Sequence, residues 1–152
     1  MKNINTQLDF DIITPQIVPT LLTIENNCHS HPWSEQTFRS CVGGRYFGFF
    51  AMHQNEIIGF YIADLVADEI TLMDICISPK FQGKGFGKAL MAHLNQQAIN
   101  KQATTILLEV RAKNISALMM YINDGFIEVG RRTGYYPSDI GYEDAIVMKK
   151  TL

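Results

Sequence analysis

The sequence predicts an α/β fold in which helices cover a mixed, mostly antiparallel sheet of about seven strands. Strand-like and helix-like segments follow one another in the order β-α-α-β-β-β-α-β-α-β-β, and one long helical segment lies between two strand-like ones. Such a strand–helix–strand unit forms a right-handed crossover, which places a parallel pair at the centre of the sheet. The 152 residues are too few for two well-packed domains, so we expect one domain over residues 1–152. About four helices should flank the sheet.

The N-terminal quarter should form one strand and two helices. Apolar residues alternate with polar ones over residues 8–12, which is typical of a half-buried strand. A threonine–proline pair then supplies a cap and a first-turn proline for a helix over residues 15–25. After a loop, Ser34 can cap a short second helix over residues 34–41, which a pair of glycines ends.

Three strand-like segments follow. Apolar and aromatic residues dominate residues 46–52 and 57–65, and the polar break HQNE between them has the length of a hairpin turn. These two segments should therefore be neighbouring antiparallel strands. Residues 69–78 (EITLMDICIS) are again strand-like, and Pro79 ends that strand.

The second half begins with the strongest helical pattern in the chain. Phe86, Leu90, Leu94 and Ala98 recur every four residues, which places them on one face of a long helix. The segment TTILLEVR (104–111) that follows is strongly β-prone. Its continuous apolar run predicts a strand buried on both faces.

A further helix and a hairpin complete the chain. The helix should run over residues 116–123 and end at the Asp-Gly pair that follows it. Residues 126–136 and 143–150 are strand-like, and the sequence PSDIG (137–141) between them should form the turn.

Composition and charge exclude several classes of protein. Apolar residues make up 47% of the chain and charged residues 18%, as in ordinary folded domains. The 13 Lys and Arg residues are balanced by 15 Asp and Glu, with no block of like charge, so we expect no direct binding of nucleic acid. No apolar run approaches the roughly 20 residues of a membrane helix, and the start of the chain lacks a signal-peptide pattern. We therefore expect a cytoplasmic protein that does not contact a membrane.

The cysteines and histidines give no recognisable metal site in the sequence. Cys28, Cys41 and Cys76 are odd in number, widely spaced and form no C-x-x-C motif, which argues against both a disulfide framework and a zinc site. We interpret them as reduced, buried thiols. His29 and His31 form an H-x-H pair, but a third and a fourth ligand at convincing spacing are missing. We interpret both as loop residues and expect no metal.

The most informative segment is the glycine-rich sequence QGKGFG (82–87), which lies between a strand and the long helix. A turn of this kind lets backbone N–H groups converge at a helix N-terminus and attract an anion such as a phosphate. It is not a Walker loop, because Lys88 is followed by Ala89 rather than by Ser or Thr, and it lacks the last position of the Rossmann fingerprint. The alternative is that these glycines only form a tight turn and the start of a helix.

The spacing Gln82-x-x-Gly85-x-Gly87 resembles the acetyl-coenzyme A signature of the GNAT acyltransferase superfamily. More narrowly, five segments resemble the RimI family of bacterial N-terminal alanine acetyltransferases, which act on a small-subunit ribosomal protein. In order, these segments are HPWSE (31–35), LLEVRAKN (107–114), ALMMYINDGF (117–126), GRRTGYYP (130–137) and EDAIVM (143–148). The chain departs from the family pattern at two places. Gly83 stands where many members have arginine, and DICI (74–77) differs from the sequence that is commoner in the family.

The resemblance implies a GNAT fold, acetyl-coenzyme A (acetyl-CoA) as cosubstrate, no metal, and the N-terminus of a ribosomal protein as acceptor. The residues that it assigns to the cofactor are Ile75, Cys76, Ile77, Gln82, Gly83, Lys84, Gly85, Phe86, Gly87 and Asn114. The first three would offer backbone groups to the pantetheine arm, as a strand edge does to a peptide. Cys76 is then a bystander, because no histidine near it in sequence could activate it for a covalent mechanism. Asn114 has the alternative role of a helix N-cap.

The resemblance also implies a catalytic pair. Glu109 would be the general base, since a carboxylate in an otherwise apolar strand is costly unless it serves a purpose; the alternatives are a solvent-facing position or an ion pair with Arg111. Tyr121 would be the general acid, because a phenol of pKa ~10 suits a leaving thiolate of pKa ~8.5. Its alternative role is helix packing.

Four aromatic and polar residues would form the acceptor side, namely Trp33, Ser34, Tyr135 and Tyr136. Each has the alternative of packing within the fold. Two other functions remain open at this point: a GNAT enzyme that acetylates lysine or a small-molecule amine, and a non-catalytic module that binds acetyl-CoA. A monomer is compatible with the sequence, which does not decide the oligomeric state.

Overall fold

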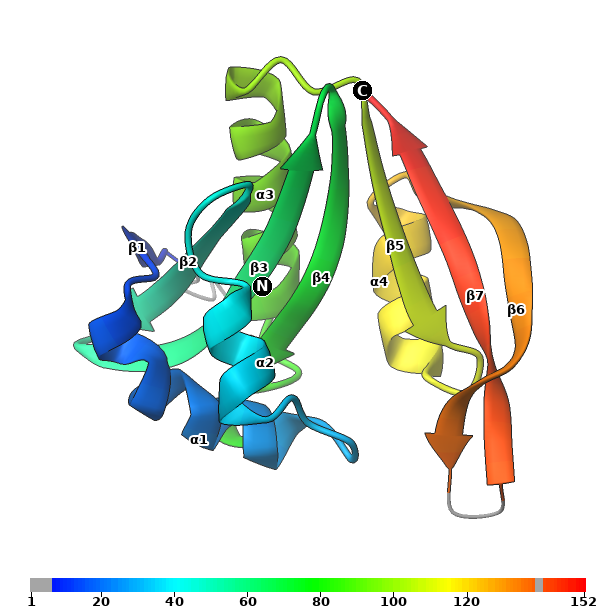
Figure 1. The fold of residues 1–152 in the computed structure, drawn as a ribbon. Coiled ribbons are helices and arrows are strands. Elements are labelled where there is room, and N and C mark those ends of the chain that lie inside the picture. The colour runs from blue at the N-terminus through cyan, green and yellow to red at the C-terminus, as the bar shows by residue number, and fades with distance from the viewer. Residues whose placement is uncertain (1–6, 139–140) are drawn as a thin grey trace, which may run out of the picture.

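The computed structural model describes residues 7–138 and 141–152, which form one seven-stranded sheet flanked by helices (Figure 1). The strands are β1 (Asp9–Ile12), β2 (Tyr46–His53), β3 (Glu56–Val66), β4 (Glu69–Ile77), β5 (Thr105–Arg111), β6 (Ile127–Ser138) and β7 (Gly141–Thr151). The helices are α1 (Val18–Cys28), α2 (Glu35–Ser40), α3 (Phe86–Asn100) and α4 (Ile115–Asn123), with single 3₁₀ turns η1 (Pro15–Ile17) and η2 (Pro79–Phe81). The predicted order of elements is confirmed.

The strand order is β1-β2-β3-β4-β5-β7-β6, and β4 with β5 is the single parallel pair. That pairing covers only Glu69–Thr71 against residues 105–107. Beyond it the two strands diverge, so that the sheet opens like a V between them (Figure 1). The predicted crossover through the long helix α3 is confirmed, and the opening of the sheet beside it creates the space for a site.

Two apolar clusters hold the helices on opposite faces of the sheet. On one face, α1 and α2 pack against β2, β3 and β4 through residues such as Leu21, Phe38 and Phe60. On the other face, α3 packs against β3, β4 and β5, and the predicted stripe of α3 is buried as expected. From Phe60 to Ala63, successive residues of β3 enter the two clusters in turn, as the two-residue repeat of a strand requires.

Two expectations about burial were wrong. Ile12 is 56% exposed, because β1 ends there and the chain turns into η1, so that Ile13 enters the core instead. In β5, buried residues alternate with partly exposed ones, whereas burial on both faces was expected. The reason is that the core packs on the face formed by Ile106, Leu108 and Val110, while the side chains of the other face stay partly exposed.

Some predicted boundaries shift. The helix expected over residues 15–25 is a 3₁₀ turn followed by α1, which runs on to Cys28. The strands of the last hairpin are longer than expected, since Ser138 belongs to β6 and Gly141 to β7. The middle of the predicted turn, residues 139–140, lies outside the described residues. Within the described part of the chain, no helix is both long and apolar enough to cross a membrane.

Candidate active site

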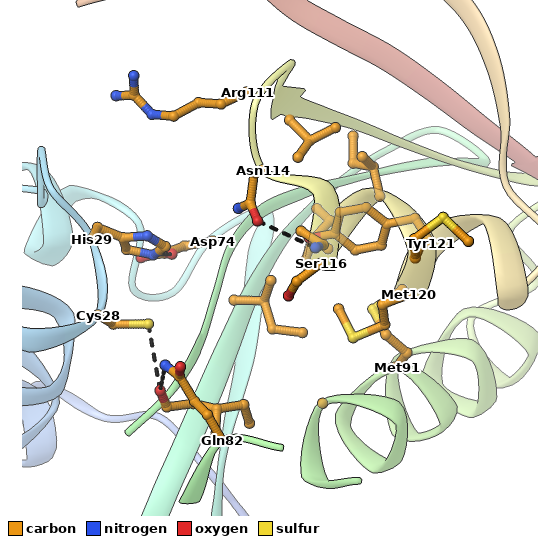
Figure 2. A pocket seen from close by; sticks show the side chains of 18 of the residues that line it. Cys28, His29, Asp74, Gln82, Met91, Arg111, Asn114, Ser116, Met120 and Tyr121 are labelled. Carbon is orange, nitrogen blue, oxygen red and sulfur yellow. Dashed lines mark hydrogen bonds and ion pairs between the residues drawn. The ribbon is translucent and has the colours of Figure 1, made fainter. Parts of the chain in front are cut away.

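A cavity of about 1010 Å³ lies where β4 and β5 diverge (Figure 2). Most of the residues singled out in the sequence reach it. Those that line it are Trp33, Ile75, Ile77, Gln82, Gly83, Gly85, Gly87, Glu109, Asn114, Tyr121 and Tyr136. Those that lie outside its lining are Ser34, Cys76, Lys84, Phe86 and Tyr135. The fold thus gathers around one space residues that lie as far apart in sequence as Trp33 and Tyr136.

The wall formed by β4 offers an open strand edge. Pairing with β5 ends at Thr71, so the side of β4 that faces β5 has no neighbouring strand around Ile75 and Ile77. The other side of this stretch pairs with β3. The Ile77 carbonyl oxygen accepts a hydrogen bond from Nε2 of Gln82 at 2.8 Å and one from the Cys28 thiol at 3.5 Å. Gln82 therefore ties the glycine-rich loop to the end of β4.

The glycine-rich loop has a backbone that only glycine adopts easily. Gly83 and Gly85 have φ angles of 76° and 88°, in the left-handed region. Gly85 is the N-cap of α3, whose first-turn N–H groups lack partners within the helix. A Cβ atom built on Gly83 would meet no atom within 4 Å, so open space lies beside the loop. Phe86 points the other way and is buried in the core at 3% exposure.

Glu109 projects from β5 with its side chain 25% exposed. Its Oε1 lies 2.7 Å from Nε of Arg132 on β6. The alternative ion pair with Arg111 is not formed, because Arg111 pairs with Glu143 at 3.2 Å and donates a hydrogen bond to the Pro137 carbonyl at 2.7 Å. The carboxylate therefore lies at the cavity with one cationic partner.

Tyr121 faces the cavity from α4, on the opposite wall from His29 and Asp74 (Figure 2). It is 5% exposed, and its ring packs against Phe126. Burial raises the pKa of the Tyr121 hydroxyl, so this group stays protonated at neutral pH. Tyr121 therefore packs within the fold, as the alternative interpretation predicted, and also lines the cavity.

Asn114 begins α4 as its N-cap. Its Oδ1 accepts a hydrogen bond from the Ala117 N–H at 3.2 Å (Figure 2). This is the N-cap role that the sequence analysis gave as the alternative. The side chain nevertheless lines the cavity, so capping and a role at the site are compatible.

The predicted acceptor residues fall into two groups. Trp33 and Tyr136 line the cavity, and the guanidinium of Arg111 lies 4.5 Å from the centre of the Tyr136 ring. Burial, followed by the charge of Glu109, raises the pKa of Tyr136 to about 12. Ser34 instead caps α2 by accepting the Thr37 N–H at 3.1 Å, and Tyr135 is 50% exposed beside Tyr136.

A cluster of titratable groups in the wall of the cavity escaped the sequence analysis. The Cys76 thiol donates to Oε1 of Glu25 at 3.2 Å and lies 3.1 Å from Nε2 of His29, which is itself 2.9 Å from Oδ1 of Asp74. His29 was expected to be a loop residue, but it caps the C-terminus of α1. A signal existed in the sequence, because Glu25 and His29 are four apart on a helix and Asp74 and Cys76 two apart on a strand.

The environment shifts the proton affinity of this cluster. Burial, reinforced by Asp74, raises the pKa of Glu25 to about 8. For His29, burial acts to lower the pKa, but the hydrogen bond and charge of Asp74 outweigh it and raise the pKa to about 9. Burial also raises the pKa of the Cys76 thiol. The three cysteines are free, as expected, but Cys28 is only partly buried.

The fold and the cavity define an acyltransferase of the GNAT class. The model of the acetyltransferase (GNAT) family matches residues 18–126, and the chain belongs to this family. It is 40% identical to the [ribosomal protein bS18]-alanine N-acetyltransferase of Escherichia coli K12 over 86% of this chain and 88% of that protein. The enzyme of the same name from Haemophilus influenzae is 44% identical over 84% and 88% of the two chains.

The structural comparison agrees with the sequence comparison. The crystal structure of the ribosomal-protein-S18-alanine N-acetyltransferase from Escherichia coli matches with a TM-score of 0.92 and 36% identity, over 95% of this chain and 94% of that one. The expected family and the GNAT fold are thereby confirmed, and the protein is an N-acetyltransferase.

Proposed function

We propose that this protein transfers the acetyl group of acetyl-CoA to the N-terminal alanine of ribosomal protein bS18, in the cytoplasm. The observation that carries the proposal is the common cavity of Glu109, Tyr121 and the glycine-rich loop, with a carboxylate and a phenol available for the two proton transfers. The names of the relatives at 40% and 44% identity support the choice of acceptor.

The residues of the cavity suit acetyl-CoA in two places. The loop of Gln82, Gly83, Lys84, Gly85 and Gly87 leads into the N-terminus of α3, which favours the phosphates of the cofactor. The open edge of β4 at Ile75 and Ile77 can hydrogen-bond the amides of its pantetheine arm. When bound, acetyl-CoA supplies the thioester carbonyl carbon that an amine attacks.

Glu109 takes the proton of the attacking amine. An α-amine has a pKa of ~8 against ~10.4 for lysine, so a single carboxylate acting through water suffices at neutral pH. Arg132 forms an ion pair with this carboxylate and holds it oriented toward the cavity. An incoming ammonium group would find the negative charge of Glu109 already in place.

Tyr121 returns a proton to the leaving thiolate. The hydroxyl is protonated when the tetrahedral intermediate forms, because its raised pKa keeps it neutral. Its position on α4 follows from the cap at Asn114 and from packing against Phe126, which together fix the helix beside the cavity.

The acceptor peptide would lie against Trp33 and Tyr136. The backbone N–H of Trp33 donates a hydrogen bond to Oε2 of Glu25 at 2.9 Å, and the guanidinium of Arg111 lies over the Tyr136 ring. Two fixed aromatic walls favour a short, extended N-terminal segment with a small first side chain.

The test is the release of coenzyme A thiol from acetyl-CoA with a peptide that copies the N-terminus of bS18. The matched control is the same peptide with a blocked N-terminus and a free lysine. Release with the free N-terminus alone is the expected result. Release with the blocked peptide would favour a lysine or small-molecule acetyltransferase, and binding of acetyl-CoA without release to any amine would favour a non-catalytic module.

A further inference from the structure

Three buried side chains and the partly exposed side chain of His29 converge on one point between the end of α1 and β4. Glu25 and His29 come from one face of α1 and its C-cap, and Asp74 and Cys76 come from one face of β4. One donor atom from each of the four lies within 4.8 Å of all the others. They combine a thiol, an imidazole and two carboxylates, which are the ligand types that zinc takes in proteins.

The spacing of these donors matches a tetrahedral site. Nε2 of His29 lies 3.1 Å from Sγ of Cys76, 2.9 Å from Oδ1 of Asp74 and 3.8 Å from Oε1 of Glu25. Sγ of Cys76 lies 3.2 Å from Oε1 of Glu25 and 3.7 Å from Oδ1 of Asp74. Metal–ligand bonds of about 2.0–2.3 Å in a tetrahedron place ligand atoms ~3.3–3.8 Å apart. Shifts of a few tenths of an ångström would therefore close the site around an ion.

The burial and the negative charge of Glu25 and Asp74 both favour a bound cation. The side chains of Glu25 and Asp74 are 2% and 5% exposed, and the structure pairs them with no Lys or Arg within the described residues. Oδ2 of Asp74 is buried and has no hydrogen-bond partner. Two buried carboxylates with one imidazole leave an excess of negative charge, which is costly unless protons or a metal ion neutralise it.

We propose that Glu25, His29, Asp74 and Cys76 form a binding site for a zinc ion. The thiolate and imidazole select zinc over magnesium or calcium, which prefer oxygen ligands alone. Binding displaces the thiol proton of Cys76 and the protons shared among the other three groups, and these are released to solvent. No bond of the acetyl-transfer reaction is involved.

The site would fasten α1 to β4 in the wall of the cavity, which Glu25, His29 and Asp74 line. His29 is the C-cap of α1 and begins the segment that leads to Trp33, so an ion held there would fix one end of that segment. The inference stands apart from the proposed acetyl transfer, because none of the four residues has been given a role in moving protons to or from the substrate.

The test is a titration of metal-stripped, reduced protein with CoCl₂, followed by displacement with ZnCl₂. One cobalt ion per chain should bind with a thiolate-to-cobalt charge-transfer band, which one equivalent of zinc should abolish. Cys76→Ala should remove this band, and Asp74→Asn should weaken binding at least ~100-fold, since even residues behind a ligand contribute 10–100-fold to metal affinity. Cys41→Ala is the matched control and should not change the affinity more than about 3-fold. Cys28→Ser tests the neighbouring thiol, which lies within 4.8 Å of donor atoms of His29 and Cys76. Binding should survive this second change, because Cys28 is not one of the four ligands.

A second readout guards against variants that simply fail to fold. Asp74→Asn keeps the size of the side chain, and its circular dichroism should match that of the unmodified protein. Zinc should raise the melting temperature of the unmodified protein but not that of Asp74→Asn. The proposal would be overturned by binding without a thiolate band, by equal affinity of Asp74→Asn and the unmodified protein, or by loss of binding in Cys28→Ser alone.

Discussion

At the scale of single residues, the account depends on a carboxylate in an apolar strand. Glu109 has apolar neighbours on both sides in sequence, and its position in β5 turns it toward the opening of the sheet. The sequence alone could not tell a catalytic position from an ion pair. In the structure its partner is Arg132 rather than Arg111, the partner that the alternative interpretation named, and Arg132 is brought close by the pairing of β5, β7 and β6.

Replacing Glu109 by Gln should lower kcat/KM by roughly 10²–10⁴, because the amide keeps the shape of the side chain but accepts no proton. Steady-state kinetics with the bS18 N-terminal peptide would measure this loss, with acetyl-CoA binding as the control for an intact site. A rate within a factor of about three of the unmodified enzyme would remove Glu109 from the mechanism.

Replacing Tyr121 by Phe should lower kcat by about 10²-fold while the KM for the peptide changes little, since only the proton donor is lost. The buried ring against Phe126 is kept, so thermal stability should be nearly unchanged. Because burial raises the pKa of Tyr121, the unmodified enzyme should show no fall in kcat from its ionisation below pH ~10. An unchanged kcat in Tyr121→Phe would assign the acid to another group.

At the scale of secondary-structure elements, the sequence was most informative where a repeat was unbroken. The four-residue repeat of α3 and the glycines after α2 and α4 marked those elements correctly, because local propensity and burial agree there. The prediction for β5 was wrong, because its continuous apolar run suggested a strand buried on both faces. Which face of a strand is covered depends on helices that are distant in sequence, so this could not be read from the strand itself.

The edge of β4 depends on one glycine in the neighbouring strand. Gly59 pairs with Ile77, and a Cβ atom at this position would overlap the backbone carbonyl oxygen of Cys76. Gly59→Ala should destabilise the fold by about 1–3 kcal/mol and raise the KM for acetyl-CoA, because β4 must move away. Chemical denaturation and initial rates would measure the two effects.

Gly130→Ala is the matched control for that experiment. Gly130 also lies in a strand, but a Cβ atom there would meet nothing within 4 Å. Its stability should change by less than about 0.5 kcal/mol. Equal stability of the two variants would contradict the close approach of β3 and β4 at Gly59.

At the scale of the whole molecule, the divergence of β4 and β5 opens the cavity that the enzyme needs for its active site. The sequence predicted that β4 and β5 pair in parallel. It did not predict how short the pairing is, because a pairing of three residues and one of nine give the same sequence pattern within each strand. Most of the site residues that its motifs singled out line the cavity, yet it missed the group of Glu25, His29, Asp74 and Cys76. Local spacing places Glu25 with His29 and Asp74 with Cys76, but the two pairs become neighbours only when α1 packs on β4.

Acetyl-CoA should stabilise the whole fold, because it would bridge the two halves of the opened sheet. At a concentration of 100 times its Kd, a ligand of the native state contributes ~2.7 kcal/mol. For a chain of this size we expect the melting temperature to rise by roughly 5–10 °C. A thermal scan with and without acetyl-CoA would test this, with a chelator present to exclude metal effects. No shift at saturating concentration would contradict binding in this cavity.

The most direct test of the central claim is to locate the acetyl group that the enzyme adds to full-length bS18. Unacetylated bS18 would be incubated with acetyl-CoA and the purified protein, and tandem mass spectrometry would read the modified position, with Glu109→Gln as the parallel control. The account predicts acetylation at the N-terminal alanine alone, and very little with the variant. Acetylation of lysine side chains, or none at all, would contradict it.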